Sequence, residues 1–300
     1  MHAAALGLGF QPVYFPYVHE SSIFASLFSG RKSLSDWISL MPFNASPATD
    51  DSPFFYNDER GPPSALSSLF YGVLFLTSLF LFVAWLSLEH SLKYCEKFGS
   101  TEIATRKLGP SSILLYFLLL GVAFMLVEVA LVQKFILFLG QPTLAFTVVL
   151  VSLLVGSGTG SFLSDRFETE SVVRRLASVL FFVGVLLAIF AVSLPFVFEK
   201  FLGQNIIART LISVCMLYPL GFSMGIPFPT GLKISKQTFK RDVGWMWGMN
   251  GMASVLGSVL AVIVAVSSGF TLALVLGAGS YLLAGFVLTR PQRLFKGKKF

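Results

Sequence analysis

Charged residues are scarce in this 300-residue chain, where Asp, Glu, Lys and Arg together make up 12% and hydrophobic residues 55%. A single soluble core cannot enclose that much apolar surface, so a mean hydropathy of +0.77 excludes an ordinary soluble domain. Two cysteines and three histidines are too few and too scattered for a zinc pattern, a disulfide framework or a nucleophile–histidine pair. We therefore expect no cofactor, no metal ion and no catalytic residue on this chain.

Long apolar segments fill most of the chain from Ala65 to Thr289. Each has about 20 residues or more, enough to cross roughly 30 Å of hydrocarbon at ~1.5 Å per residue. The predicted fold is all-α: a polytopic membrane protein whose seven-helix bundle occupies 65–289, between a short irregular segment, 1–64, and a basic tail, 290–300. The predicted spans are 65–88, 112–139, 143–163, 176–198, 206–226, 245–267 and 269–289. Gly140 is predicted to end the second span, and Pro142 suits the first turn of the third.

The positive charge is distributed unevenly about these spans. When the connecting segments are assigned alternately to two sides, 16 of the 22 Lys and Arg residues fall on one side and six on the other. Because basic residues in short loops stay in the cytoplasm, the C-terminus is predicted to be cytoplasmic and residues 1–64 outside, in a cell membrane. Lipid phosphates at the helix ends account for the net charge of +7, so we expect a lipid bilayer and no nucleic acid as partner.

Glu128 is the one acid deep inside a predicted span. Placing it there costs several kcal/mol unless it is protonated, paired or facing a wet cavity. Two interpretations are open: a proton or cation site, or a protonated residue that hydrogen-bonds a neighbouring helix. Gln133 and Lys134 do not share its face at 100° per residue, so a partner must come from another helix. Arg209, near the same end of the fifth span, is the best-placed cation.

The segment Gly156–Gly160 has the sequence GSGTG, which resembles a phosphate-binding loop at first sight. It lies within a span, without the strand–loop–helix context that nucleotide binding requires. Since Gly156 and Gly160 are four residues apart on one helical face, they predict a close contact between helices.

A charged pair, Asp165 and Arg166, follows Gly160 at a predicted cytoplasmic helix end. The arrangement resembles the loop signature of major facilitator transporters, in which an acid and an Arg lock adjoining helices in one conformation. Phe167 and Glu168 stand where that family has Gly and a basic residue. The pair is either a conformational latch or an ordinary charged helix end.

The segment Pro219–Gly231 contains three prolines and three glycines. Proline removes a backbone donor and clashes with the preceding turn, so the segment is predicted not to form one regular helix. Transporters place ligands at such breaks, which gives Pro227 and Pro229 a candidate binding role. The other interpretation is that the fifth helix leaves the membrane here. Asn250, one turn into the sixth span, needs a partner for its amide and is predicted to adjoin this segment.

Four groups of residues, in order, resemble motifs of multi-pass, spermidine synthase-like membrane proteins. The first resembles that family's PTDDRPFF segment, with Ser52 where the family has Arg. The groups are 48–55, 121–128 with 133–143, 225–232 and 247–258. In that family a Rossmann-like aminopropyltransferase domain precedes the helices, and residues 1–60 would be its last part.

The adenosyl-binding loop and catalytic acid of those synthases are absent from this chain, so the resemblance implies no catalytic or cofactor-binding residue here. An adenosyl-dependent enzyme also belongs in the cytoplasm, whereas the charge distribution places residues 1–64 outside. The leading hypothesis is a non-enzymatic membrane module of that group, with a transport-like or membrane-subunit role. Glu128, the Pro219–Gly231 break and Asn250 would line its site.

Two alternatives to this hypothesis stay open. The chain is the membrane half of a split aminopropyltransferase-like enzyme, or it is an anchor or assembly subunit of a larger complex. The expected partners besides lipid are therefore a separate chain carrying a Rossmann-like domain, or other membrane subunits.

Overall fold

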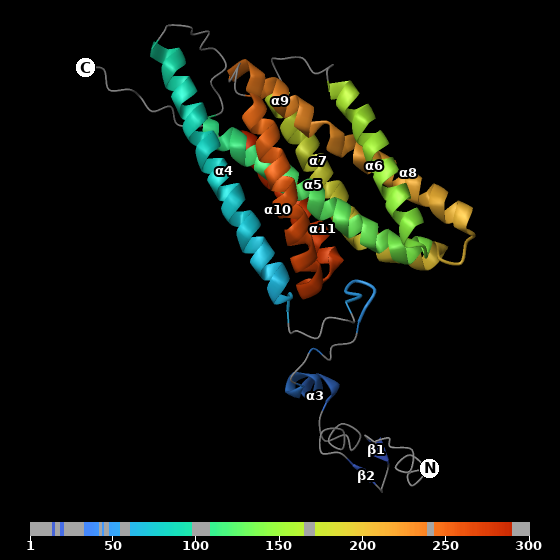
Figure 1. The fold of residues 1–300 in the computed structure, drawn as a ribbon. Helices are drawn as coiled ribbons and strands as arrows, with labels where there is room; N and C mark the ends of the chain where they lie inside the picture. Colours follow the sequence, from blue (N-terminus) through green and yellow to red (C-terminus); the bar gives the residue numbers. More distant parts are fainter. Residues whose placement is uncertain are drawn as a thin grey trace. The chain divides into compact units, whose positions relative to one another are not determined.

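A computed structural model of the chain describes residues 14–15, 19–20, 33–41, 44, 48–54, 61–97, 109–164, 172–238 and 243–289. The chain forms two compact units. The first consists of 1–49 and 53–61, and the second of 50–52 and 62–300. Figure 1 shows the ribbon of both.

The first unit contains little regular structure among its described residues. A two-residue strand β1 (Tyr14–Phe15) pairs antiparallel with β2 (His19–Glu20). Helix α3 (Leu34–Leu40) begins after Ser33, whose Oγ accepts a hydrogen bond from the Asp36 N–H at 3.2 Å, a typical helix cap.

The second unit is a bundle of helices, as predicted from the sequence. Among the described residues, seven helical segments are long and apolar enough to cross a membrane, and α8 and α9 together form one of them. The prediction of an all-α polytopic fold is therefore confirmed. The helices are α4 (Ser64–Lys97), α5 (Pro110–Leu139), α6 (Pro142–Ser164), α7 (Val172–Phe201), α8 (Ile206–Gly225), α9 (Pro227–Thr238), α10 (Val243–Ser268) and α11 (Phe270–Thr289).

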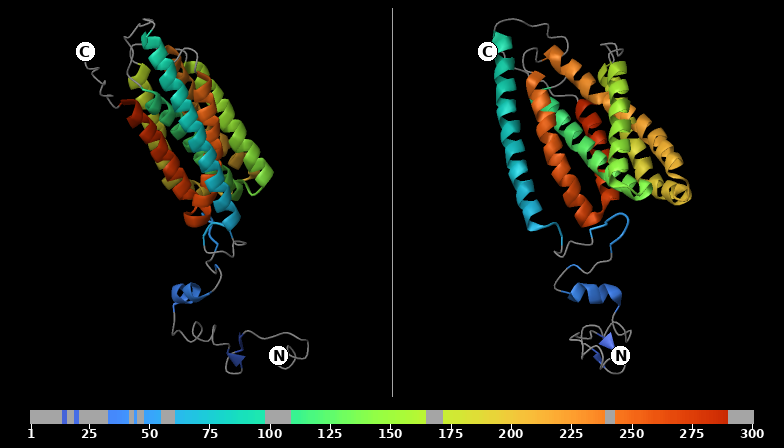
Figure 2. Two further views of the ribbon diagram at one scale, coloured as in Figure 1. Left: turned by 60° about the vertical axis from the view of Figure 1, so that its left-hand side comes forward. Right: turned by 45° about the vertical axis from the view of Figure 1, so that its right-hand side comes forward.

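Helix α5 occupies the centre of the bundle. It packs mainly against α10 and α11, and also contacts α4, α6, α8 and α9. In its most apolar stretch 61% of the residues are buried, against 17% in α4, which packs chiefly on α10. The views in Figure 2 show α4 at the edge of the bundle, so most of its surface is left for lipid or for another protein.

The turn between α5 and α6 follows the local chemistry that the sequence predicted. Gly140 ends α5 in the left-handed conformation with φ of 74°, and its N–H donates to the Ile136 carbonyl at 2.8 Å. Pro142 then opens α6, where its missing N–H costs nothing.

Helices α6 and α8 meet backbone to backbone. A Cβ added at Gly156 would lie 2.6 Å from the Tyr218 carbonyl oxygen, and one at Gly160 would overlap the Phe222 carbonyl oxygen. On the opposing helix, a Cβ at Gly221 would lie 2.7 Å from the Leu153 carbonyl oxygen. The predicted role of Gly156 and Gly160 as a close helix contact is confirmed, with small residues on both helices.

The Pro219–Gly231 segment breaks at one point only. Helix α8 continues through Pro219 to Gly225, and α9 starts at Pro227. Pro229 lies in the first turn of α9, where its missing N–H has no intrahelical acceptor to lose. The predicted interruption is confirmed at Ile226, whereas Pro219 does not end a helix.

One buried hydroxyl in α4 lacks a hydrogen bond. Thr77 is 2% exposed, and its Oγ1 has no partner within the described part of the chain. We expect Thr77→Val to leave the thermal midpoint of the purified protein unchanged or raised, because it removes an unpaired polar group without changing the shape.

The matched control for that substitution is Thr230→Val in α9. Thr230 is equally buried, but its Oγ1 donates to the Ile226 carbonyl at 2.7 Å. The thermal midpoint of Thr230→Val is therefore expected to fall. A lower midpoint for Thr77→Val than for Thr230→Val would contradict this account of the two hydroxyls.

Candidate functional site

The polar contacts of the bundle are arranged along α5. From Tyr116 to Phe138 this helix meets different partners at successive levels, over about 33 Å at 1.5 Å per residue. The residues proposed from the sequence lie at separate levels of this axis, so they do not form one cluster.

The α8–α9 break lies near the Pro110 end of α5. The Tyr116 hydroxyl donates to the Pro227 carbonyl at 2.7 Å. Phe228 packs edge-on against Phe117, with ring centroids 5.6 Å apart, and against Trp247 of α10, with centroids 4.8 Å apart. The break is thus enclosed by protein, the condition under which irregular backbone is tolerated at membrane depth.

Asn250 lies on α10, one turn after Trp247, the residue that packs against Phe228 at the α8–α9 break. Its carbonyl lies against Gly121 of α5, where a Cβ would meet it at 2.5 Å. That carbonyl also accepts a hydrogen bond from the Ser254 hydroxyl at 2.9 Å. The Asn250 amide is partly exposed and has no hydrogen-bond partner among the described residues.

Glu128 lies on the side of α5 that is turned toward α10. It shares its helical face with Gly121, seven residues earlier, and with Met125, three residues earlier. A Cβ at Gly257 of α10 would lie 3.2 Å from the Met125 Cβ, which fixes the direction of this face. Glu128 is half-buried and has neither a hydrogen bond nor an ion pair within the described ranges.

Arg209 does not pair with Glu128. Its Nη1 donates to the Phe138 carbonyl at 2.8 Å, ten residues beyond Glu128 and about 15 Å further along α5. The guanidinium therefore caps the C-terminal end of α5, where the helix dipole favours a cation. Its buried Nε lacks a partner among the described residues.

The other candidates are placed as follows. Gln133 is exposed and lies away from the Glu128 face, as its spacing predicts. Pro229 is half-buried in α9 and Pro227 is buried. The proposed latch, Asp165 and Arg166, lies outside the described residues, since the description of α6 ends at Ser164.

A polar cluster that was not proposed from the sequence joins three distant parts of the chain. Lys134 of α5 is 7% exposed. Its Nζ lies 2.6 Å from Asp51 Oδ1 and donates to the Thr271 hydroxyl of α11 at 2.8 Å. The Thr271 hydroxyl in turn donates to Asp51 Oδ1 at 2.6 Å. We call Asp51, Lys134 and Thr271 the Asp51 cluster.

Asp51 also caps the start of α11. Its carboxylate accepts the Thr271 N–H at 3.0 Å, and its carbonyl accepts the Phe270 N–H at 3.0 Å. These are two of the N–H groups that a helix leaves without an internal partner, here satisfied by a residue 220 positions away. Gly269 precedes them with φ of 90°, and a Cβ there would overlap the Asp51 carboxylate.

The pKa of Asp51 follows from this environment. Burial raises the pKa of the carboxyl, but hydrogen bonds from Lys134 and Thr271, together with the Lys134 charge, outweigh burial and lower it. A carboxyl whose pKa is lowered in the folded state stabilises that state above its unfolded pKa, about 3.9, and loses the effect as pH falls through the folded value.

We therefore expect the difference in thermal midpoint between the wild type and Asp51→Asn to be constant from about pH 5 to pH 7 and to shrink only below about pH 4. Midpoints measured in detergent over this range provide the test. A difference that already disappears between pH 5 and pH 7 would show that the Asp51 charge is not held as described.

The sequence carried a signal for part of this cluster. Lys134 is a cation inside a predicted span, and such a residue requires an acid or a helix end nearby. Its position on a different helical face excludes Glu128 as that acid, so the partner must lie elsewhere in the chain. Nothing near Asp51 in sequence indicates that it reaches the start of the last helix, since Thr271 is an unremarkable position.

No protein-family model, no curated protein and no solved structure matches the chain. Within the described residues, no group of three or more His, Cys, Asp or Glu is placed to hold a metal ion. The seven apolar helical segments of the described ranges make the chain a multi-pass integral membrane protein.

Proposed function

We propose that this protein belongs to the spermidine synthase-like group of membrane proteins and is a non-enzymatic membrane subunit of a larger complex. It would lie in the cell membrane with its first residues outside and its C-terminus in the cytoplasm. The single observation that carries the subunit role is Glu128, a carboxyl at membrane depth that none of the described residues neutralises.

The contacts between the motif segments support the group assignment. Asp51, from the first motif, binds Lys134 in the second. Gly121 lies against the Asn250 carbonyl, and Phe228 against Trp247, so the later motifs also meet α5 and one another. Residues that hold α5, α9, α10 and α11 together are the ones that a shared fold would retain.

The edge helix α4 supports the subunit role. Large apolar side chains cover much of its surface, among them Tyr71 at 68%, Phe75 at 67% and Phe82 at 57% exposed. It contacts α10 through Trp245, whose Nε1 donates to the Ser87 hydroxyl at 3.1 Å and whose ring lies tilted against Phe80, with centroids 5.3 Å apart. Much of α4 is therefore available to a neighbouring subunit.

The test is the size of the protein extracted from its native membranes in a mild detergent. We expect native gels to show it in a species well above the 32.8 kDa chain and its detergent, with other chains in fixed proportion. A monomer alone would contradict the subunit role. A co-purified chain that contains an adenosyl-binding loop would replace it with the split aminopropyltransferase-like enzyme.

A transport-like role is the second candidate, because Glu128 is half-buried and is a protonatable group at membrane depth. Transport requires water to reach this carboxyl. Glu128→Cys, in a background lacking Cys95 and Cys215, should then react with a membrane-impermeant methanethiosulfonate in open membrane fragments. Asp50→Cys, exposed and outside the spans, is the positive control. The subunit role predicts reaction at position 50 only.

A further inference from the structure

We propose that the side of α5 around Glu128 binds a single transmembrane helix of a different chain, which carries a basic side chain at the depth of Glu128. This inference rests on the proposed subunit role and specifies the chemistry of the partner. We call the receiving surface, formed by Glu128, Val129, Val132 and Ile136, the Glu128 face.

The depth of Glu128 excludes bulk water as its usual partner. It lies 18 residues from Pro110 and 11 from Leu139, so about 27 Å and 16 Å of helix separate it from the two ends of α5. The hydrocarbon layer is about 30 Å thick, so even a strongly tilted α5 keeps this carboxyl within it.

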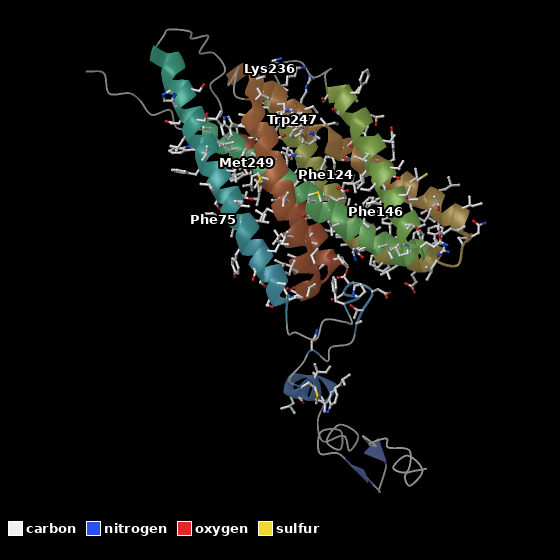
Figure 3. The ribbon with its side chains drawn as sticks, viewed as in Figure 1. Phe75, Phe124, Phe146, Lys236, Trp247 and Met249 are labelled. Atoms are coloured by element: carbon white, nitrogen blue, oxygen red, sulfur yellow. The ribbon has the colours of Figure 1, made fainter. Side chains whose placement is uncertain are left out.

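The Glu128 face is only partly covered within the bundle, whereas the opposite side of α5 is closed. Val129, Val132 and Ile136 are partly exposed, like Glu128 itself. On the other side Val127 and Leu131 are fully buried. Val127 packs directly against Gly277 of α11, because a Cβ added at that glycine would contact the Val127 side chain. Figure 3 places Phe124, one turn before Glu128, on the part of α5 that is seen between α10 and α6.

The composition of this face fits a helix rather than a water-filled path. Three apolar side chains surround the single carboxyl, and an apolar strip with one polar group is the pattern by which transmembrane helices recognise one another. The flanking residues Leu260 and Val264 of α10 are also apolar and partly exposed. A helix placed here gains side-chain packing and satisfies the carboxyl at the same time.

A second copy of this chain does not supply the required cation. Lys134 is bound to Asp51 and Thr271, and Arg209 is bound to the Phe138 carbonyl. Within the described ranges these are the basic residues inside α5 and near its level in α8. Each already binds a group of its own chain, and the Arg209 Nε that lacks a partner is itself buried. Charge complementarity therefore favours a partner helix from another chain, with Lys or Arg near its centre.

The experiment uses the full chain in phosphatidylcholine vesicles with two synthetic transmembrane peptides. Both are Leu- and Ala-based helices of equal length, one with a central Lys and the other with Leu at that position. A donor dye is attached at Gln141→Cys, an exposed site next to α5, after Cys95 and Cys215 are replaced, and an acceptor dye is attached to each peptide. Energy transfer then reports binding.

We expect the Lys peptide to reach half-saturation at a concentration at least five-fold lower than the Leu peptide. This preference should disappear with Glu128→Leu and weaken with Glu128→Gln. Leu283→Ala, on an exposed part of α11, is the control and should keep the full preference. Thermal midpoints of all variants establish that each is folded, and the Gln variant preserves the side-chain shape.

Equal binding of the two peptides would overturn the proposal, as would a Lys preference that survives Glu128→Leu. Self-association of the labelled chain that depends on Glu128, without any Lys preference, would overturn it in favour of a pairing of two carboxyls between copies. The size of the native complex is measured independently of Glu128. A large native species together with equal binding of the two peptides would therefore contradict this inference but support the subunit role.

Discussion

Replacing Gly160 with alanine is expected to disrupt the packing of α6 on α8. The added methyl would occupy the position of the Phe222 carbonyl oxygen, so the two backbones must move apart. Overpacking of this kind costs about 1–3 kcal/mol, and more where the obstacle is backbone. We expect the thermal midpoint in detergent to fall by on the order of 5–10 °C, from about 2–4 °C per kcal/mol in a chain of this size.

Gly158→Ala is the matched control for this prediction. Gly158 lies on the same helix two residues earlier, is exposed, and has no atom within 4 Å of an added Cβ. Alanine is the better helix former by roughly 0.5–1 kcal/mol, so this variant should be as stable as the wild type or more so. If both variants melted alike, the close contact between α6 and α8 would not be as described.

Removing the acid from the Asp51 cluster is expected to have the second large effect. Asp51→Ala leaves the buried ammonium of Lys134, whose side chain is 8% exposed, with only the Thr271 hydroxyl. Breaking a buried pair in this way costs about 3–5 kcal/mol, and since the Asp51 side chain is 36% exposed we expect the lower part of that range. The loss of the cap on α11 adds about 1 kcal/mol.

Lys134→Met should cost much less, because the carboxyl left behind is partly solvated and still accepts the Thr271 N–H. The double variant should be more stable than Asp51→Ala alone, since it contains no unpaired buried charge. Asp50→Ala, next to Asp51 but exposed, is the control and should be neutral. Thermal midpoints of the wild type, the two single variants and the double variant complete the cycle. Additive losses would contradict a direct interaction between Asp51 and Lys134.

The membrane spans could be predicted from the sequence because their cause is local. A run of apolar residues of sufficient length forms a helix in a bilayer whatever its neighbours are. The turn between α5 and α6 likewise depends on two residues alone: Gly140 ends α5 and Pro142 starts α6, as predicted. Pro219 lies inside α8 without ending it, because a proline inside a membrane helix is tolerated when neighbouring helices support it.

The arrangement of the polar residues could not be predicted in the same way. The position of Glu128 alone indicates that placing its carboxyl in the membrane costs free energy. Its surroundings depend on how α5 crosses α10, and no local sequence pattern specifies that crossing. The pair of Lys134 and Asp51 is 83 residues apart in sequence, and its link to Thr271 is longer still. Charge alone favours Arg209 as the partner of Glu128, whereas a helix end is an equally good partner for a cation.

The Asp51 cluster has a consequence for biosynthesis. Asp51 and Lys134 are both made early, whereas Thr271 follows Lys134 by 137 residues, on the order of 10 s later at the usual pace of translation. The ion pair of Asp51 and Lys134 can therefore form before α11 leaves the ribosome, and α11 then packs against a polar site that is already assembled. In a nascent chain without Asp51, the Lys134 ammonium would lie in the bilayer without any partner until the last helix is made. Such a chain would be an early target for membrane quality control.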